Sequence, residues 1–197
     1  KIEQQGNTAN RLLDQITISY NSALLVQEIG QALTSILDID KLLKFVMETL
    51  EKRLDFDRGM IMLANPDKTR LVYVSGYGYG PEFEMILKET QFHLDNPKSK
   101  GPFVIAFKQQ EPILVSDIND VQNDISRRSA DLVETLGVSS FICVPIVYEG
   151  KSEGILAVDN YRSHKPHNQS EVSLLMGIAP QIAISINTAR IYEKLQK

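Results

Sequence analysis

The first 37 residues predict a helix that contacts two different surfaces. Residues 8–37 contain no proline, and their apolar side chains recur at the spacing of an amphipathic helix. In the first half these side chains share one side of the helix: Leu12, Leu13, Ile16, Tyr20, Ala23 and Leu24. In the second half they cluster roughly opposite: Val26, Ile29, Leu33, Ile36 and Leu37. A helix that packs on one globular core needs only one apolar face. The first half is therefore expected to meet another surface.

The C-terminal helix has the same property. Asn168, followed three residues later by Glu171, is a capping-box pattern that marks a helix start. One face carries Val172, Leu175, Ala179, Ile182, Ile186 and Ala189, and the opposite face carries Ile184, Ile191 and Leu195. A single copy would expose apolar stripes on both end helices, and self-association would bury them. We expect a parallel homodimer whose helices pair through Leu12, Ile16, Tyr20, Ile184, Ile191 and Leu195.

Between the end helices, after a second helix expected at 38–54, the apolar pattern changes to that of strands. The strands are expected at 59–65, 70–76, 92–94, 112–116, 139–148 and 154–160. The short polar turns "NPDKT" and "EGKSEG" suit antiparallel hairpins. The fold class is therefore α+β, with a central antiparallel sheet of about six strands.

A polar, irregular segment, "DINDVQNDISRRSADLVETLG" at 117–137, interrupts the strands, with one short helix expected near its end. A segment of this kind is either a binding loop or lid, or a solvated connection. Arg127 and Arg128 would meet an anionic group in the first case and form a solvated pair in the second. Asp117 is expected to cap the turn that follows it.

Composition excludes several classes of function. The chain has 21 Lys and Arg against 25 Asp and Glu, a net charge of −4, which argues against a nucleic-acid partner because that would need a basic face. One cysteine excludes an internal disulfide and a multi-cysteine metal site. His93, His164 and His167 do not stand at metal-ligand spacings, and no nucleophile elbow or phosphate loop is present. We predict no catalytic residue, no metal and no membrane segment, and we take a chain that begins with Lys1 to be a piece of a longer protein.

The stretch "LVYVSGYGYGPEFEMILKET" at 71–90 has the order strand, glycine loop, helix. That order is typical of dinucleotide-binding sites, whose G-x-G-x-x-G pattern would place a third glycine at position 81. Pro81 stands there instead, at the favoured first position of a helix. We therefore interpret Gly78 and Gly80 as a hinge between a strand and a short helix.

Cys143 lies in the middle of a predicted strand, "FICVPIV". A lone cysteine in that position is usually a small buried apolar residue. The sharper alternatives are a covalent chromophore attachment or a thiol nucleophile, but no histidine stands near it in the sequence.

These elements together resemble the GAF domains, small-molecule-sensing modules of cyclic-nucleotide phosphodiesterases, phytochromes and bacterial signalling proteins. The resemblance rests on a strand ending V-P-I, a "GILAVDN" strand after a short hairpin, and a capped last helix ending N-x-A-R-I-Y. The stretches "EPILVSDI" and "ALTSILDIDKLLKFVMETLEKRLDFDRGMIML" resemble earlier family elements. The resemblance implies a GAF domain at 24–190, preceded by a signalling and dimerisation helix at 1–23 and followed by a linker helix starting at 191–197.

The resemblance also implies a pocket on the face of the sheet opposite the end helices, covered by segments around 81–110 and 117–137. The family-like pocket positions are Phe92, Phe103, Asp117, Ile118, Arg128, Leu136, Phe141, Cys143 and Asp159. The ligand is not identified. Members that bind cyclic nucleotides carry an Asn-Lys…Phe…Asp-Glu signature, which is matched here only by Asn160 and, conservatively, by Glu171. Bilin-binding members place a cysteine beside a histidine, which Cys143 does not reproduce, and the sulfoxide-reducing members need more than one cysteine.

We therefore expect a non-catalytic cytoplasmic sensor from a bacterial histidine kinase, nucleotide cyclase or transcription activator. It would bind a small molecule, or relay a signal, through a helical dimer to an output domain outside this chain. The alternative is a dimerisation and relay module without a ligand. A cavity filled by bulky side chains would favour that alternative.

Overall fold

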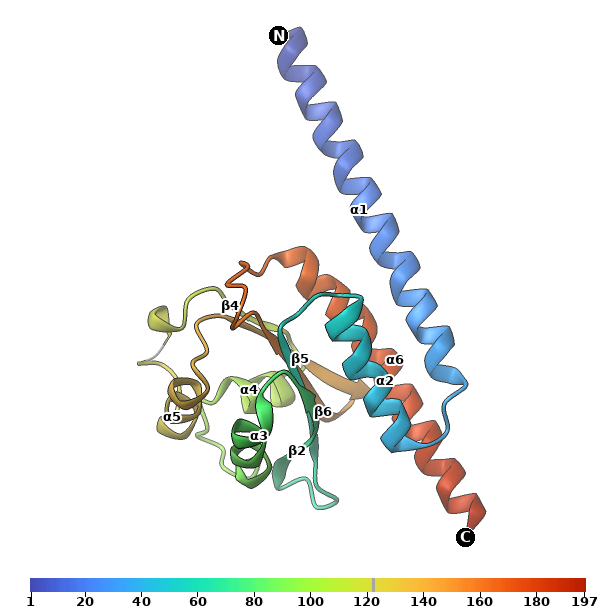
Figure 1. Cartoon of the computed structure of the whole chain (residues 1–197), viewed down its shortest axis with the longest axis vertical. Coiled ribbons are helices and arrows are strands. Elements are labelled where there is room, and N and C mark those ends of the chain that lie inside the picture. The colour runs from blue at the N-terminus through green and yellow to red at the C-terminus, as the bar shows by residue number, and fades with distance from the viewer. Residues whose placement is uncertain (122) are drawn as a thin grey trace.

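A computed structural model describes residues 1–121 and 123–197 (Figure 1). Residue 122, in the predicted segment 117–137, lies outside the described residues. The helices are α1 (Ile2–Thr34), α2 (Ile39–Lys52), α3 (Gly80–Glu89), α4 (Pro102–Gln109), α5 (Arg127–Leu136) and α6 (Gln169–Gln196). The strands are β1 (Arg58–Ala64), β2 (Arg70–Tyr77), β3 (Gln91–His93), β4 (Ile113–Val115), β5 (Phe141–Tyr148) and β6 (Lys151–Asp159).

The six strands form one antiparallel sheet in the order β3-β2-β1-β6-β5-β4. The two longest hairpins, β1–β2 and β5–β6, meet at the centre, where β1 pairs with β6. The predicted α+β class and the antiparallel sheet of six strands are confirmed. Each predicted strand is present, and its ends move by no more than three residues.

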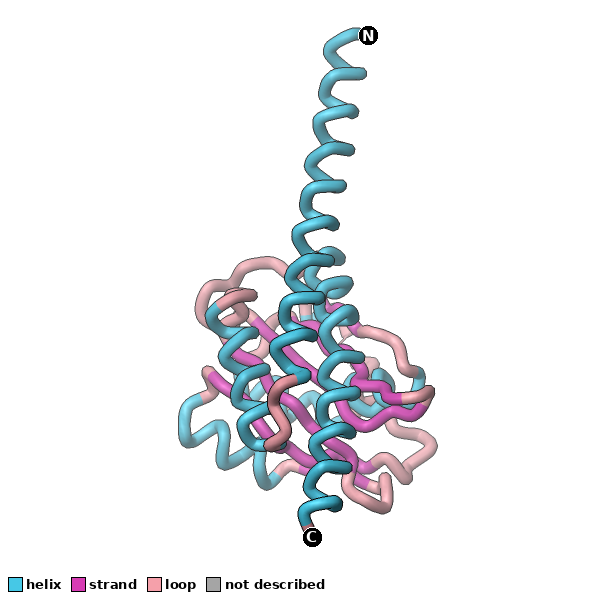
Figure 2. The backbone as a smooth tube through the Cα atoms, turned by 90° about the vertical axis from the view of Figure 1, so that its right-hand side faces the viewer, coloured by secondary structure: helices cyan, strands magenta, loops and turns pink. Residues whose placement is uncertain are grey.

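The two faces of the sheet pack against different helices. Alternate strand residues such as Ile142, Val144 and Ile146 join α1, α2 and α6 in one apolar core. Their neighbours, among them Phe141 and Cys143, join α3, α4 and α5 in a second core on the other face. Figure 2 shows the layer of α1, α2 and α6 over one side of the sheet. Because strand side chains alternate between faces, one sheet supplies both cores.

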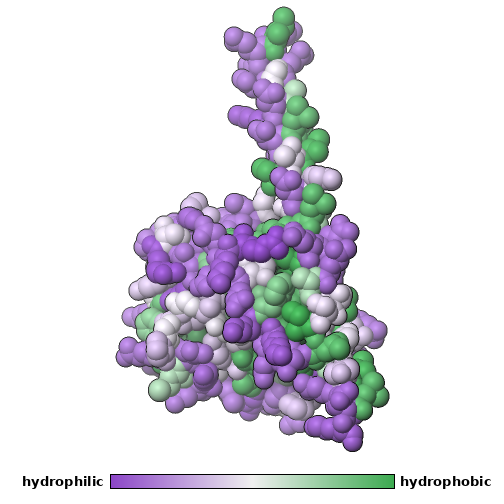
Figure 3. All heavy atoms as spheres, turned by 45° about the vertical axis from the view of Figure 1, so that its right-hand side comes forward, coloured by the Kyte–Doolittle hydropathy of each residue, from purple (hydrophilic) through white to green (hydrophobic). Residues whose placement is uncertain are grey.

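The N-terminal half of α1 leaves the globular body, and only its C-terminal part packs on the domain (Figures 1 and 3). Ile29 and Leu33 are buried, whereas Leu12, Ile16 and Tyr20 are 55%, 64% and 64% exposed. Figure 3 shows hydrophobic side chains gathered along one side of the protruding helix. The predicted change of apolar face is confirmed.

Helix α6 also has two apolar sides. The predicted stripe from Val172 to Ala189 is buried, and Ile184, Ile191 and Leu195 are exposed. Asn168 and Glu171 form the predicted capping box. By length and composition α6 is the one described helix that could cross a membrane, but 50% of its most apolar stretch is buried inside the fold. That burial gives α6 a sufficient reason to be apolar.

One helix lies outside the sequence prediction. Helix α4 begins with Pro102 at its first turn and ends at Gln110 in a left-handed conformation. Its sequence "PFVIAFKQ" is rich in β-branched and aromatic residues, which have low helix propensity. Apolar residues surround most of its circumference, so it lacks the one-sided pattern by which a helix is recognised.

Candidate functional site

A small cavity lies between the sheet and helices α4 and α5. Its volume is about 30 Å³, close to the space that one water molecule occupies. The lining residues are Met60, Tyr79, Phe92, Pro102, Phe103, Ser129, Leu132, Val133, Leu136, Val138, Phe141, Ala157, Val158 and Asp159. Five of the predicted pocket residues are among them: Phe92, Phe103, Leu136, Phe141 and Asp159. Ile118 and Cys143 are buried in the same core without lining the cavity.

The structure does not bring the other two predicted pocket residues, Asp117 and Arg128, to the cavity. Asp117 is exposed, and its Oδ1 accepts a hydrogen bond of 2.9 Å from the backbone N–H of Asn119. The predicted capping role of Asp117 is thereby confirmed. Arg128 is also exposed, and its Nη1 donates to the carbonyl oxygen of Gln91 over 2.6 Å.

Three phenylalanine rings pack against one another at the cavity between the sheet and helices α4 and α5. The Phe103 ring lies edge-on to Phe92, with 5.3 Å between centroids, and edge-on to Phe141, with 6.2 Å. Such arrangements are favourable for aromatic rings. Phe103 comes from α4 and is half-buried, whereas Phe92 and Phe141 come from the sheet and are buried. In this conformation the rings occupy the room that a ligand would need.

Arg58 is a functional candidate that the sequence analysis missed. Its guanidinium is 1% exposed, and it forms a two-pronged ion pair with Asp159: Nε to Oδ1 at 2.8 Å and Nη2 to Oδ2 at 3.0 Å. Nη1 donates to the carbonyl oxygen of Leu136, at the end of α5, over 2.8 Å. A cation is favourable at the C-terminal end of a helix. Burial raises the pKa of the Asp159 carboxyl, although the Arg58 guanidinium acts in the opposite direction.

Two tyrosine rings cover the guanidinium of Arg58. Its central carbon lies 5.0 Å from the ring centre of Tyr79 and 4.2 Å from that of Tyr161. Tyr79 belongs to the "GYGYG" stretch and lines the cavity. Burial raises the pKa of its hydroxyl well above the usual value, so the phenol stays neutral. The glycine stretch thus contributes a wall of the cavity.

The Arg58–Asp159 pair had a sequence signal. Arg58 opens one apolar strand, Asp159 closes another, and in the antiparallel register the two stand opposite each other. A charged residue at the end of an otherwise buried strand usually needs a partner. The periodicity of the sequence does not predict that β1 pairs with β6. Without that pairing, nothing in the sequence indicates that Arg58 and Asp159 are partners.

The segment between β6 and α6 is hydrogen-bonded to Asp57, the residue next to Arg58. Oδ2 of Asp57 accepts hydrogen bonds from the backbone N–H groups of Arg162 (2.9 Å) and Ser163 (2.6 Å). Burial acts to raise the pKa of Asp57, but these hydrogen bonds outweigh it and lower that pKa. The amide of Asn160 donates to the carbonyl oxygen of Lys165 over 3.1 Å. The ion pair at the cavity wall is therefore linked through a short, well-bonded segment to the start of α6.

His167 ends this segment and is fully buried without a hydrogen bond. Neither ring nitrogen has a partner among the described residues, and the nearest acid, Glu171, approaches Nδ1 at 3.8 Å. The ring packs near Phe56, with 6.1 Å between centroids. Burial lowers the pKa of His167 below 6.5, although Glu171 and Asp159 act to raise it. The folded protein therefore favours the neutral ring.

The buried His167 should make the stability of the fold depend on pH. Below pH 6.5 the unfolded chain takes up a proton that folded His167 resists, so the free energy of unfolding should fall as the pH drops from 7 to 5. We expect His167→Phe to remove this part of the fall and to add about 1 kcal/mol at pH 7, because two unpaired buried nitrogens disappear. Urea denaturation at both pH values measures it. The control His164→Asn, at an exposed site, should keep the wild-type slope. An unchanged slope in His167→Phe would contradict the assignment.

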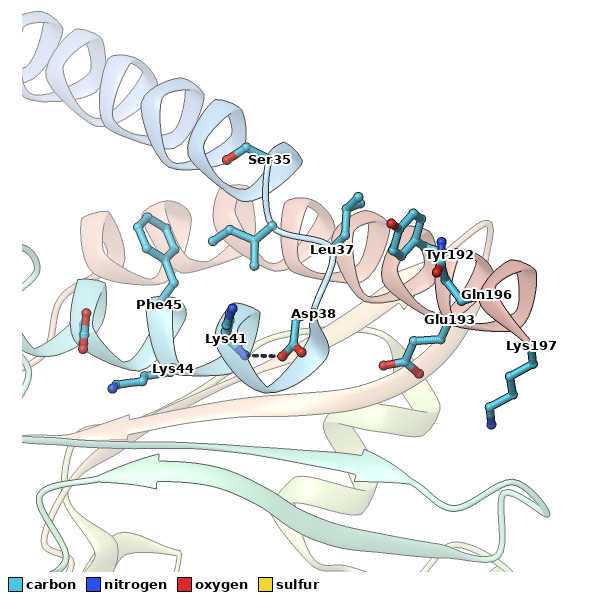
Figure 4. Close-up of a pocket in the computed structure, with 12 residues that line it drawn as sticks. Ser35, Leu37, Asp38, Lys41, Lys44, Phe45, Tyr192, Glu193, Gln196 and Lys197 are labelled. Carbon is cyan, nitrogen blue, oxygen red and sulfur yellow. Dashed lines mark hydrogen bonds between the residues drawn. The ribbon is translucent and has the colours of Figure 1, made fainter.

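A much larger groove lies among helices α1, α2 and α6. Its lining residues come from 35–48 and 192–197, outside the part of the sequence that holds the predicted pocket residues. It measures about 970 Å³ and lies between the α1–α2 connection, α2 and the last turns of α6. Figure 4 shows Leu37, Phe45 and Tyr192 around it, together with charged side chains of both signs. The Asp38 side chain beside it caps α2 by accepting from the backbone N–H of Lys41 over 2.9 Å. This groove contains none of the predicted ligand-pocket residues.

The comparison with known families decides the classification. The family model "GAF domain" matches residues 38–186. The chain belongs to the GAF domain family. GAF domains are generally regulatory sensor domains, as the resemblance in the sequence indicated. No curated protein matches the chain.

Solved GAF-like structures share this fold. Residues 122 to 287 of a methyl-accepting chemotaxis protein are 24% identical, with a TM-score of 0.70 over 83% of this chain and 98% of that one. The GAF domain of a phosphoenolpyruvate-protein phosphotransferase from Coxiella burnetii is 18% identical, with a TM-score of 0.70 over 89% and 98%. A domain of a putative two-component sensor histidine kinase from Sinorhizobium meliloti 1021 is 21% identical, with a TM-score of 0.60 over 80% and 97%. At these identities the likenesses establish the fold.

Proposed function

We propose that this GAF domain is a non-catalytic sensor that forms a parallel homodimer and relays the state of its cavity to an output domain outside this chain. The observation that carries the proposal is the buried Arg58–Asp159 pair. On one side it holds the end of α5, which covers the cavity. On the other side Asp159 accepts from the backbone N–H of Tyr161, in the segment that leads to α6, over 3.1 Å. A change under α5 therefore has a short physical route to α6.

The exposed apolar stripes support the dimer. Leu12, Ile16 and Tyr20 on α1 and Ile191 and Leu195 on α6 are each more than half exposed. Helices α1 and α6 run in the same direction along the domain (Figure 1). A two-fold axis parallel to them would cover both stripes and place both C-terminal ends at the same end of the dimer. A ligand that favours one cavity conformation would then shift the relative pose of the paired helices.

A charge placed in the α1 stripe tests the dimer. We expect Ile16→Glu to weaken dimerisation at least about tenfold, because pairing would bury two unpaired carboxylates. Sedimentation equilibrium measures the dissociation constant. The matched control Asn7→Glu adds the same charge on the opposite side of α1 and should leave the constant nearly unchanged. A wild-type monomer at high micromolar concentration, or equal effects of the two variants, would contradict the proposal.

A second candidate, a dimerisation and relay module without a ligand, is favoured by the cavity volume of about 30 Å³. Native mass spectrometry separates the two candidates. A dimer that carries a small-molecule adduct supports the sensor, and a dimer that stays bare after expression in several hosts supports the relay.

We also propose a wider setting for the domain, which its family membership supports. We place the domain in the cytoplasm of a bacterium, in a histidine kinase, a nucleotide cyclase or a transcription activator, with the same polypeptide supplying the output. The fold likeness to domains of a chemotaxis protein and a sensor histidine kinase is consistent with this setting. Activity assays of the purified domain toward sulfoxides and nucleotides test its non-catalytic character.

A further inference from the structure

We propose that the cavity under α5 takes a small uncharged ring compound, between benzene and indole in size, and that it opens at the N-terminal end of α5. This inference rests on the proposed sensory function and names the ligand class of the same site. It follows from the polar groups around the cavity, the aromatic walls and the way α5 is attached.

The cavity offers no free charge to a ligand. Its one charged lining residue is Asp159, whose two oxygens already accept from Arg58 and from the backbone N–H of Tyr161. The Ser129 hydroxyl accepts from the Ser126 hydroxyl at 2.9 Å. The Tyr79 hydroxyl forms no hydrogen bond with another described residue, so it can serve one polar atom of a ligand. A charged molecule would be desolvated there without a counter-ion.

The walls favour a flat ring. Phe92 and Phe141 project from the sheet, and Phe103 from α4 stands edge-on to both. A ligand ring that replaced the half-buried Phe103 would inherit the same edge-to-face contacts. The remaining walls, including Met60, Leu132 and Ala157, are apolar. An apolar cavity of about 150 Å³ is enough to bind benzene, so entry requires Phe103 or α5 to move.

An arginine side chain attaches each end of α5 to the rest of the domain, and the two attachments differ in strength. At its C-terminal end, the buried Arg58 donates to Leu136 and is fixed by Asp159 and two tyrosine rings. At its N-terminal end, the exposed Arg128 donates once, to the carbonyl oxygen of Gln91. Gly137 then ends the helix in a left-handed conformation, with φ of 69°. The strong attachment is therefore a pivot, and the Arg128 end is the one that opens.

Cavity enlargement tests the ligand class. Phe103→Ala should bind indole at least about tenfold more tightly than the wild type, and benzoate about 100-fold more weakly than indole. Amide chemical shifts report both the affinity and the place, and the changes should gather at Tyr79, Phe92, Leu132 and Phe141. Phe103→Leu serves if the alanine variant does not fold. Benzoate or inorganic phosphate that binds as tightly as indole, or indole shifts away from these residues, would overturn the inference.

The opening end has its own test. Arg128→Ala should speed amide hydrogen exchange in the first turn of α5, and the uptake of indole, by about fivefold, the equivalent of one exposed hydrogen bond. The matched control is Arg127→Ala, because the side chain of the neighbouring Arg127 forms no hydrogen bond with another described residue. Equal rates in the two variants would overturn the opening at this end.

The outcomes separate the ligand class from the sensory function. A charged native ligand recovered from this cavity would overturn the uncharged class and leave the sensor proposal standing. A monomeric wild type would count against the sensor proposal, whereas indole binding in Phe103→Ala would still support the ligand class.

Discussion

Replacing Arg58 with methionine is expected to lower the free energy of unfolding by about 3–5 kcal/mol at pH 7, because it leaves the buried carboxylate of Asp159 without its cationic partner. The end of α5 also loses the hydrogen bond to the carbonyl oxygen of Leu136. Urea denaturation of the two proteins measures the difference. A loss below about 1 kcal/mol would mean that the pair is not the structural link described here.

Two further measurements identify the cause of that loss. Without Arg58, the strongest influence that lowers the pKa of Asp159 is gone, so burial raises its folded-state pKa further, against the smaller opposing effects of the Tyr161 backbone N–H and His167. A raised pKa stabilises the folded state at low pH and loses that contribution as the pH rises through it, so the deficit relative to wild type should shrink between pH 7 and pH 4. The double variant Arg58→Met with Asp159→Leu should recover much of the stability, since no charge remains buried. A deficit that is independent of pH would assign the loss to packing instead.

Gly78→Ala is expected to destabilise the fold by about 3 kcal/mol or more. Gly78 has a φ of 83°, which costs alanine about 1–2 kcal/mol. An added Cβ would also stand 2.3 Å from the carbonyl oxygen of Asp57 and 3.0 Å from the Arg58 side chain. Moving the backbone of Asp57 away from the added Cβ costs free energy, so the substitution should disturb the strand that carries Arg58. Thermal and urea unfolding measure the effect.

Gly80→Ala is the matched control for Gly78→Ala. Gly80 has nearly the same φ, 81°, but nothing lies within 4 Å of an added Cβ. Gly80→Ala should lower the free energy of unfolding only by the cost of the left-handed backbone conformation, about 1–2 kcal/mol. Equal losses in the two variants would show that the close approach at Gly78 has no energetic weight. The difference gives the glycine stretch a structural reason beyond the hinge that its sequence suggested, and the hinge stays a prediction.

The parts of the fold that sequence could predict are those with a strong period. The stripe from Val172 to Ala189 and the capping box at Asn168 each reflect local geometry, and each is confirmed. The opposite apolar faces of α1 are also a local pattern. This pattern predicts that Leu12 and Ile16 are exposed, whatever the arrangement of the sheet.

The parts that sequence could not predict depend on contacts between distant segments. Arg58 and Asp159 are 101 residues apart and meet only because β1 pairs with β6. Tyr79 becomes a cavity wall because the chain turns at two glycines. Arg128 was placed in the pocket by family resemblance, yet its side chain reaches the carbonyl oxygen of Gln91 outside the cavity. Helix α4 has no one-sided pattern, so tertiary burial overrides its weak propensity.

In the proposed function, the state of the cavity sets the pose of the paired helices. A spin label on Lys194→Cys, near the end of α6, measures it as the distance between the two copies of a Phe103→Ala dimer. Cys143 is fully buried and will not compete for the label. With indole bound in the cavity, as followed by amide shifts, we expect the distance distribution to move by a few ångströms, on the order of known helix shifts at interfaces. An unchanged distribution at full occupancy, or no distance between copies, would contradict it.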